Sequence, residues 1–246
     1  VMDAKETENV KVSDLWMELV RNRPLRILSL FFIVAYTTMS ISNAADSYFM
    51  TYNIGATPFM TTAFMWLGTI PAFIFLPLVP AIKKKIGKAG MFKMFLGISI
   101  VGMVLMYAVV SIPSLKSCFP LLCVVQFIKS VGVLVATGYM WALVPEVVTF
   151  GEYTTGRRVA AIVNALICIF MKAGMALGGV IPGLVLAWVG FDAAAKVQTP
   201  LAEQGILWLV TLIPVVLFFF AIFIIGKYEL SDERMDQINM EIAKRR

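Results

Sequence analysis

The chain has 246 residues, of which 60% are hydrophobic and 15% charged, and its mean hydropathy is +0.86. This composition excludes a soluble domain and leaves room for about six membrane spans of roughly 20 to 25 residues. The net charge is +6, but the basic residues follow the loops and form no single patch, which favours membrane topology over nucleic-acid binding. The sequence contains no histidine, no metal-ligand spacing and no nucleophile–base pair, so it predicts neither an enzyme nor a bound cofactor.

The first 24 residues are polar and are predicted to be a cytoplasmic lead-in, in which VSDLWMELV forms a short interfacial helix. Because the sequence starts with Val1 and not with Met, this lead-in is expected to come from the interior of a longer chain. Residues 228–246 are predicted to be a cytoplasmic tail. The transmembrane domain, residues 25–227, contains six apolar segments, at residues 25–50, 59–82, 91–112, 117–144, 159–189 and 205–227.

The distribution of basic residues predicts the orientation in the membrane. Of the 21 Lys and Arg, only Lys116 and Lys196 fall on one side, and Lys129 and Lys172 fall inside apolar segments. All the others lie on the opposite side. The positive-inside rule therefore predicts a multi-pass protein of the cell (inner) membrane with both termini in the cytoplasm.

The two lysines inside apolar segments are the most informative residues. Lys172 is roughly 21 Å along a helix from Arg158, and Lys129 is about 15 Å from the start of its segment. A charged lysine at such a depth costs between about 2.5 and more than 10 kcal/mol, so it needs a partner. The one acid inside an apolar segment, Asp46, is predicted about 30 Å from Arg26, at the opposite interface. The counter-charge is therefore expected from outside this chain, from a ligand, or from loss of a proton.

Polar residues line one face of three predicted spans. The stripe on the fourth span consists of Gln126, Lys129, Ser130, Val133, Thr137, Met140 and Trp141. The fifth span repeats Asn164, Cys168 and Lys172 at four-residue intervals, and the first carries Tyr36, Thr37, Ser40, Asn43 and Ser47. Amides, hydroxyls and an indole suit a polyhydroxylated ligand such as a sugar. The alternatives are that Trp141 is an interfacial anchor and that the hydroxyls and amides only join helices.

A longer stretch, GYMWALVPEVVTFGEYTTGRRVAAIVNALICIFMKAGMALGG, resembles the signature of the glycoside-pentoside-hexuronide:cation symporters. These form the melibiose-permease-like branch of the major facilitator superfamily. The segments YNIG, KKKIGK and VGFD extend the likeness along the chain. The resemblance implies an all-α membrane fold in which six spans, arranged as two inverted three-helix repeats, form the C-terminal half of a twelve-span transporter. It also implies that the aspartates holding the coupling cation belong to the N-terminal half.

The resemblance also implies roles for single residues. Lys172 matches the family's lysine at the sugar and cation site. The loop from Glu146 to Arg158 matches the acidic signature through Glu146, Gly151, Glu152 and Tyr153, and its acids, Tyr153, Arg157 and Arg158 are expected to gate the inner face. Thr149 stands where the family has a second acid and Ala161 where it has a glycine, and Lys129 has no counterpart. A charged sugar such as a hexuronide would explain a second lysine.

The sequence therefore predicts a secondary active transporter that imports a sugar or glycoside with Na⁺ or H⁺ by alternating access. Its candidate substrate- and cation-binding residues are Lys172, Lys129, Gln126, Thr137, Trp141, Asn164 and Asn43. Its expected partners are the lipid bilayer, a small sugar and an N-terminal six-span half. Two alternatives stay open. The first is a carrier of a non-sugar organic anion or lipid-like substrate, and the second is a self-sufficient six-span scaffold or homodimeric carrier.

Overall fold

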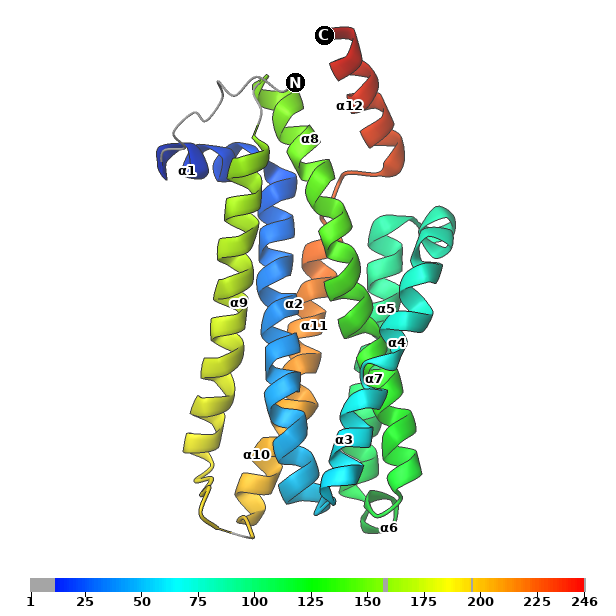
Figure 1. The fold of residues 1–246 in the computed structure, drawn as a ribbon, viewed down its shortest axis with the longest axis vertical. Coiled ribbons are helices and arrows are strands. Elements are labelled where there is room, and N and C mark those ends of the chain that lie inside the picture. The colour runs from blue at the N-terminus through cyan, green and yellow to red at the C-terminus, as the bar shows by residue number, and fades with distance from the viewer. Residues whose placement is uncertain (1–11, 157–158, 196, 246) are drawn as a thin grey trace.

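The computed structural model describes residues 12–156, 159–195 and 197–245. Every regular element within these ranges is helical (Figure 1), which confirms the all-α fold class. The elements are α1 (Val12–Arg21), α2 (Arg23–Tyr48), η1 (Phe49–Ile54), α3 (Pro58–Leu67), α4 (Ile70–Phe75), η2 (Leu76–Leu78), α5 (Val79–Ser111), α6 (Pro113–Lys116), α7 (Phe119–Tyr139), η3 (Met140–Leu143), α8 (Val144–Thr155), α9 (Ala160–Trp188), α10 (Pro200–Val210), α11 (Leu212–Ile225) and α12 (Asp232–Arg245).

The start of α2 is set by its capping residues. The Asn22 side chain accepts a hydrogen bond from the backbone N–H of Leu25 at 3.0 Å, and Pro24 occupies the first turn, where its missing N–H costs nothing. The amide of Asn22 also donates to Glu18 at 2.8 Å. This bond ties α2 to α1, which lies across the bundle axis as an interfacial helix would (Figure 1).

Five helical stretches in the described chain are long and apolar enough to cross a membrane, whereas the sequence predicts six spans. The second stretch, Pro58–Ser111, is 54 residues long and contains the predicted spans 59–82 and 91–112. Inside it, Gly87 leaves the helical conformation with φ 74° and ψ 170°, and the chain reverses direction between α4 and the body of α5 (Figure 1). A stretch of this length is more than twice the roughly 20 residues that one crossing needs. The number of crossings stays a prediction.

The segment predicted as a polar loop before the fifth span is a helix. Val144–Thr155 forms α8, which continues from α7 through the short η3 and ends at Gly156 in the left-handed conformation, with φ 69°. Pro145 stands in the first turn of α8, where a proline does not interrupt the hydrogen bonding. The polar residues of this segment therefore lie on a helix surface and are held at fixed spacings.

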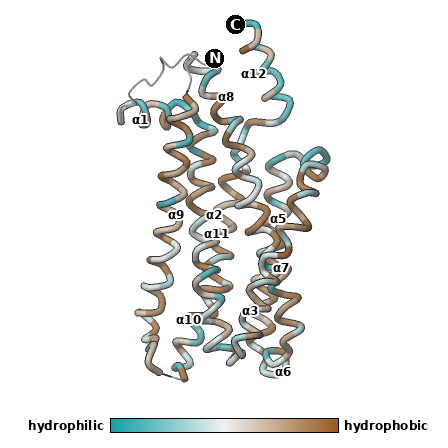
Figure 2. Tube along the Cα trace, in the orientation of Figure 1, coloured by the Kyte–Doolittle hydropathy of each residue, from teal (hydrophilic) through white to brown (hydrophobic). Residues whose placement is uncertain are grey.

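α2 lies at the centre of the bundle and packs against α9, α11 and α7, while α7 packs along α5. The core consists of two apolar clusters. One surrounds the first half of α2 and the second half of α7, and the other surrounds the end of α2, the start of α7 and α10. Hydrophobic residues run along the spans, and hydrophilic residues gather at the end where α1 and α12 lie (Figure 2). Between the two clusters, α2 and α7 carry buried polar side chains.

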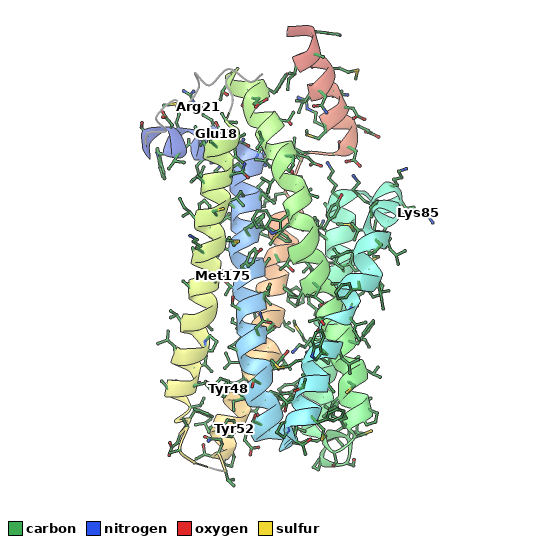
Figure 3. The ribbon with its side chains drawn as sticks, in the orientation of Figure 1. Glu18, Arg21, Tyr48, Tyr52, Lys85 and Met175 are labelled. Atoms are coloured by element: carbon green, nitrogen blue, oxygen red, sulfur yellow. The ribbon has the colours of Figure 1, made fainter. Side chains whose placement is uncertain are left out.

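The opposite end of the bundle is closed by aromatic residues. Figure 3 shows Tyr48 and Tyr52 at the end away from Glu18 and Arg21. The two tyrosine rings stack with centroids 6.2 Å apart, and both meet Phe191 edge to face, at 5.4 and 5.1 Å. Amphipathic rings at the end of a span are typical of the membrane interface.

Candidate functional site

α7 is positioned by a close backbone contact with α5. A Cβ atom at Gly102 would collide with the backbone of Lys129, and a Cβ atom at Gly132 would collide with the carbonyl of Phe95. The Ser99 hydroxyl donates to the Lys129 carbonyl at 2.5 Å and accepts from the Gly132 N–H at 2.7 Å. Glycine is needed at both positions because the two helices touch backbone to backbone. The polar face of α7 is therefore held in a fixed direction, toward α2.

The most buried ionisable group of this face is paired within the chain. The Lys129 ammonium lies 2.5 Å from Oδ1 of Asp46, and the two side chains are only 1% and 9% exposed. The Gln126 amide donates to the other carboxylate oxygen, Oδ2, at 2.9 Å. The expectation that no carboxylate of this chain reaches the lysines is wrong for Lys129. Its charge is neutralised by Asp46, so the presence of Lys129 gives no reason to infer an anionic substrate.

The reason for this error is the length of the first apolar stretch. Arg23–Ile54 has 32 residues, about 48 Å of helix, which exceeds the roughly 30 Å thickness of the bilayer core. Counting from Arg26 therefore placed Asp46 beyond the core. Counting back from Ile54 places it about 12 Å inside, at a depth that suits Lys129.

Directly after the end of α7, Trp141 of η3 meets two aromatic residues of α2. The Trp141 indole N–H donates to the Tyr36 hydroxyl of α2 at 3.0 Å, and its ring meets Phe32 edge to face at 5.0 Å. Tyr36 and Phe32 are buried, whereas Trp141 stays 39% exposed. These three residues, here called the aromatic corner, join the stripes predicted on the first and fourth spans. Trp141 thus keeps part of an oriented indole ring exposed.

The remaining polar residues of the first and fourth spans are only partly brought together. Gln126, Ser130 and Thr137 are buried on α7, as a face turned into the bundle requires. The Thr137 hydroxyl bonds to the Val133 carbonyl of its own helix at 2.7 Å, so it joins no other helix. Asn43 of α2 is exposed and lies outside the buried group.

On the fifth predicted span, now α9, the polar stripe faces outward. Lys172, Asn164 and Cys168 are all exposed, and the Asn164 amide donates to the Ala160 carbonyl of the same helix at 2.8 Å. The opposite face of α9 packs on α2 at Gly174 and Gly178, where a Cβ atom would meet the α2 backbone. Lys172 therefore does not face α7 within this bundle. Among the described residues its ammonium has no hydrogen-bond or ion-pair partner.

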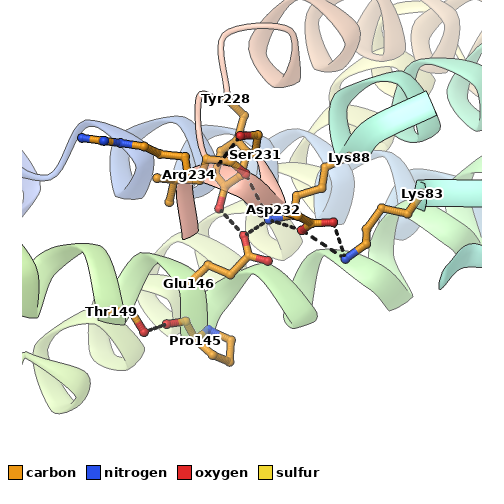
Figure 4. Close-up of polar contacts among 10 residues, drawn as sticks. Lys83, Lys88, Pro145, Glu146, Thr149, Tyr228, Ser231, Asp232 and Arg234 are labelled. Carbon is orange, nitrogen blue, oxygen red and sulfur yellow. Dashed lines mark hydrogen bonds and ion pairs between the residues drawn. The ribbon is translucent and has the colours of Figure 1, made fainter. Parts of the chain in front are cut away.

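A second polar group, here called the Lys88 cluster, lies where α5, α8 and the C-terminal segment meet (Figure 4). The Lys88 ammonium, 4% exposed, lies 2.7 Å from Glu146 and 2.9 Å from Asp232, and it donates to the Leu230 carbonyl at 3.0 Å. The other members are Lys83, 3.0 Å from Asp232, and Tyr228, whose hydroxyl donates to Glu146 at 3.3 Å. Sequence reasoning singled out Glu146 of this cluster and noted Lys83 and Lys88 only as part of the segment KKKIGK. A basic residue directly after Gly87, the glycine that turns the chain, was the available signal for Lys88.

The ionisation of the C-terminal members follows from their surroundings. Burial raises the pKa of the Tyr228 hydroxyl, and the neighbouring Glu146 carboxylate raises it further, so Tyr228 remains a donor. Burial also acts to raise the pKa of Asp232. The hydrogen bonds and charges of Lys88 and Lys83 outweigh it, and the pKa is lowered. Asp232 is therefore ionised wherever the cluster is formed.

The other residues predicted to gate the inner face have separate surroundings. The Tyr153 hydroxyl donates to Glu241 of α12 at 2.7 Å. Glu152 and Thr149 border a hollow of about 460 Å³ between α8 and α12, and the Thr149 hydroxyl bonds to the Pro145 carbonyl of its own helix at 3.0 Å (Figure 4). Arg157 and Arg158 lie outside the described residues. The structure thus links α8 to the C-terminal helix of the same chain.

A bundle of long apolar helices with a buried ion pair and an aromatic corner at its centre is the architecture of a multi-span membrane protein of the solute-carrier kind. Comparison with known families agrees with this class. The family model described as MFS/sugar transport protein matches residues 2–232, and the chain belongs to that family.

Known relatives match along nearly the whole chain. An uncharacterized symporter of Bacillus subtilis (strain 168), YnaJ, is 37% identical over 98% of this chain and 50% of its own length. A glucuronide carrier protein homolog of Escherichia coli (strain K12) is 31% identical over 93% of this chain and 49% of its own. A putative sulfoquinovose importer of Salmonella typhimurium is 28% identical over 98% and 50%. The chain spans about half the length of these relatives.

Proposed function

We propose that this chain acts as the C-terminal half of a secondary active transporter that imports a sugar or glycoside together with Na⁺ or H⁺. The two halves would rock against each other and expose a central site to one side of the membrane at a time. The protein would lie in the cell (inner) membrane with the α1 and α12 end in the cytoplasm, where most of its Lys and Arg residues gather. The partner of this chain would be an N-terminal half that contributes the acids holding the coupling ion.

The observation that carries this proposal is the aromatic corner formed by α2 and η3. Trp141 is fixed by its hydrogen bond to Tyr36 and its edge contact with Phe32, yet 39% of its surface is open. A preoriented and partly exposed indole supplies an apolar face for a sugar ring at little cost in side-chain entropy. An indole that served only as core packing would be covered, and one that served only as an interfacial anchor would not need a buried tyrosine as its partner.

The charge of the substrate rests on Lys172. Because Lys129 is neutralised by Asp46, Lys172 is the deeply placed lysine that is left to attract a ligand or an acid of the other half. Glucuronides and sulfoquinovose, named for two of the relatives, are sugars that carry an acid group. A sugar with a carboxylate or sulfonate is therefore the substrate class we propose.

Transport by the full-length protein in proteoliposomes tests this function. A Na⁺ or H⁺ gradient should drive uptake of an acidic sugar or its glycoside. Trp141→Leu should raise the half-saturating sugar concentration by about tenfold, equivalent to ~1.4 kcal/mol of binding free energy. Trp188→Leu is the matched control, since Trp188 is 76% exposed and stacks only on Trp208 at 6.1 Å, and it should transport normally. Uptake of organic anions without a sugar ring, unaffected by Trp141→Leu, would contradict the sugar assignment.

Gating of the cytoplasmic side is the second part of the proposal. The Lys88 cluster joins α5, α8 and the C-terminal segment, so these elements would move together when the inner face opens. Glu146→Gln should change the transport rate more than the affinity for the sugar. A variant with unchanged rates would show that these charges only hold the tail in place.

A further inference from the structure

The outward face of α11 is apolar along its length and ends beside two cations. α11 contains no polar side chain, and the stretch that includes it, Pro200–Ile225, has the highest mean hydropathy of the five, 2.9. Val216, Phe219, Phe220 and Phe223 are between 54% and 63% exposed and line an open hollow of about 420 Å³. In the described part of the chain, no other element contributes to this lining. These four residues are called here the phenylalanine face.

The two cations are Lys227, which follows α11, and Lys93 of α5. The Lys227 ammonium lies 4.1 Å from the centroid of the Phe223 ring. The Lys93 ammonium reaches the same turn, where it would be 3.1 Å from a Cβ atom at Gly226. Because Gly226 has ordinary helical angles, φ −63° and ψ −19°, its missing side chain is not required by the backbone and leaves room for Lys93. Both ammonium groups therefore lie at the end of the phenylalanine face from which the chain continues to α12.

These two charges are not balanced by the acids around them. Among the described residues, neither Lys93 nor Lys227 forms an ion pair. The first two acids that follow Lys227 in the chain are bound elsewhere, Glu229 to Arg23 at 2.8 Å and Asp232 to the lysines of the Lys88 cluster. Two like charges beside one helical turn repel each other. An anion placed between them would neutralise both.

We propose that the phenylalanine face, Lys93 and Lys227 bind one phospholipid with an anionic headgroup. An acyl chain lies along the phenylalanine face, and the phosphate bridges the two ammonium groups. The dimensions agree with this arrangement. Val216 and Lys227 are eleven residues apart, about 16 Å along a helix, and one leaflet contributes about 15 Å of hydrocarbon.

A lipid fits this face better than a partner helix does. Helices in a membrane are joined through small residues and hydrogen bonds, and the phenylalanine face has neither small nor polar residues. α9 differs, because its exposed surface carries Lys172, Asn164 and Cys168. The lipid lies on the outer surface of the bundle, so it is a bound neighbour and not the transported substrate.

The first test compares two lipids with the same acyl chains, phosphatidylglycerol and phosphatidylcholine, by native mass spectrometry of the full-length protein. Phosphatidylglycerol should bind more tightly. Lys93→Gln/Lys227→Gln should weaken its binding about thirtyfold, since each lysine near an anionic lipid contributes about fivefold. Lys84→Gln/Lys85→Gln removes two exposed lysines of α5 and is the matched control, which should bind normally. Equal binding of the two lipids, or equal losses in the two double variants, would overturn the proposal. Displacement of the lipid by an equal concentration of glycerol 1-phosphate, which has no acyl chain, would do the same.

The second test identifies what covers the phenylalanine face. Phe220 is replaced by a photoreactive benzoylphenylalanine in the full-length protein, in nanodiscs with equal amounts of the two lipids. Illumination should attach phosphatidylglycerol severalfold more often than phosphatidylcholine, and Lys93→Gln/Lys227→Gln should remove this preference. Crosslinks to a second copy of the chain or to an N-terminal half would show that protein covers the face and would overturn the proposal. Neither test measures sugar uptake, so a failure of the proposed transport function would leave both results in place.

Discussion

Among single residues, Asp46 and Lys129 have the largest expected effect on the stability of the bundle, because they form a buried ion pair between α2 and α7. Moving either charge alone into the membrane core costs several kcal/mol, and their attraction offsets this cost only while both are present. The Gln126 bond fixes the carboxylate so that Oδ1 points at the ammonium. The pair therefore adds little net stability, but it joins α7 to α2 through contacts that both charges must be present to satisfy.

The first prediction concerns this balance. Lys129→Met leaves an uncompensated carboxylate and should lower the free energy of unfolding by about 3–5 kcal/mol in Na⁺-free buffer. Asp46→Asn/Lys129→Met removes both charges and should cost much less. Urea or thermal unfolding of the purified full-length protein in choline chloride measures both variants. Equal losses for the single and the double variant would mean that the ion pair has no energetic role.

The sequence identified the chemically important residues better than it identified their partners. Gln126, Lys129 and Trp141 were found because a charge inside an apolar segment and a polar helix face are both visible in the letters. The partners of Lys129 and Trp141, Asp46 and Tyr36, depend on how far one helix slides along another, and periodicity gives the face of a residue but not its depth. The outward direction of Lys172 was missed for a related reason. One face of α9 carries glycines and another carries Asn164, Cys168 and Lys172. Only the packing shows that the glycine face meets α2.

At the scale of helices, α2 and α9 are joined by small residues and not by charge. Gly174 and Gly178 let the two backbones approach until the Thr37 hydroxyl donates to the Gly174 carbonyl at 3.0 Å. Between helices in a membrane, close packing and such hydrogen bonds replace the hydrophobic driving force. Small residues four positions apart on a membrane span are typical of such close approach. The structure shows it at Gly174 and Gly178, whereas Gly179 and Gly183 face open space.

Two alanine substitutions side by side test this contact. Gly178→Ala should destabilise the protein by about 1–3 kcal/mol, because the new methyl group overlaps the Ser40 side chain and helices must separate. Gly179→Ala has nothing within 4 Å of its Cβ and should be neutral or stabilising by up to about 1 kcal/mol, since alanine favours the helix. Thermal unfolding in detergent compares the two. Similar effects at both positions would contradict the packing.

The C-terminal helix is joined to the bundle by charges that respond to pH. The folded-state pKa of Asp232 is lowered by Lys88 and Lys83, so its contribution is present above its unfolded pKa of about 3.9 and is lost as the pH falls through the lower folded value. Acidification below about pH 4 should therefore release α12, which amide hydrogen exchange in α12 would report. Asp232→Asn should show the released state at neutral pH. Protection of α12 that persists at low pH in both proteins would contradict this attachment.

The helices were predictable from the sequence, and their joints were predictable only in part. Apolar segments mark the helices by composition, and the five stretches contain them. Most ends agree with the prediction within about five residues, but the third stretch continues to Thr155, beyond the predicted end at residue 144. The turn at Gly87 falls between the predicted spans 59–82 and 91–112, whereas the segment before the fifth span, predicted as a loop, is helical. The contacts that hold these joints, from Lys88 to Glu146 and Asp232, come from segments far apart in the sequence.

At the scale of the whole molecule, the span with the smallest buried share, α9, carries Lys172, a lysine without a counter-charge among the described residues. Only 22% of the most apolar window of α9 is buried, and Lys172 lies exposed on that helix. A lysine facing hydrocarbon costs about 2.5–3.5 kcal/mol on insertion scales. The same lysine in contact with an acid of a second half, or with a ligand, would be stabilised. The surface of α9 therefore suits a protein neighbour better than lipid.

The last prediction tests whether α9 faces lipid or a second half of the protein. Expressed alone, this chain should aggregate or be degraded, and co-expression with the N-terminal half of the proposed transporter should restore a monodisperse complex in size-exclusion chromatography.

Lys172→Met should improve the yield of the chain alone, because the exposed charge is gone. It should also abolish sugar uptake by the assembled transporter, because the ligand or the opposing acid has lost its partner. Lys85→Met, near the turn that Gly87 makes within α5 (Figure 3), is the matched loss of one charge. It should neither improve the yield of the chain alone nor abolish uptake. A stable homodimer of the unmodified chain that transports by itself would replace the half-transporter with a self-sufficient carrier, in which α9 meets its own copy.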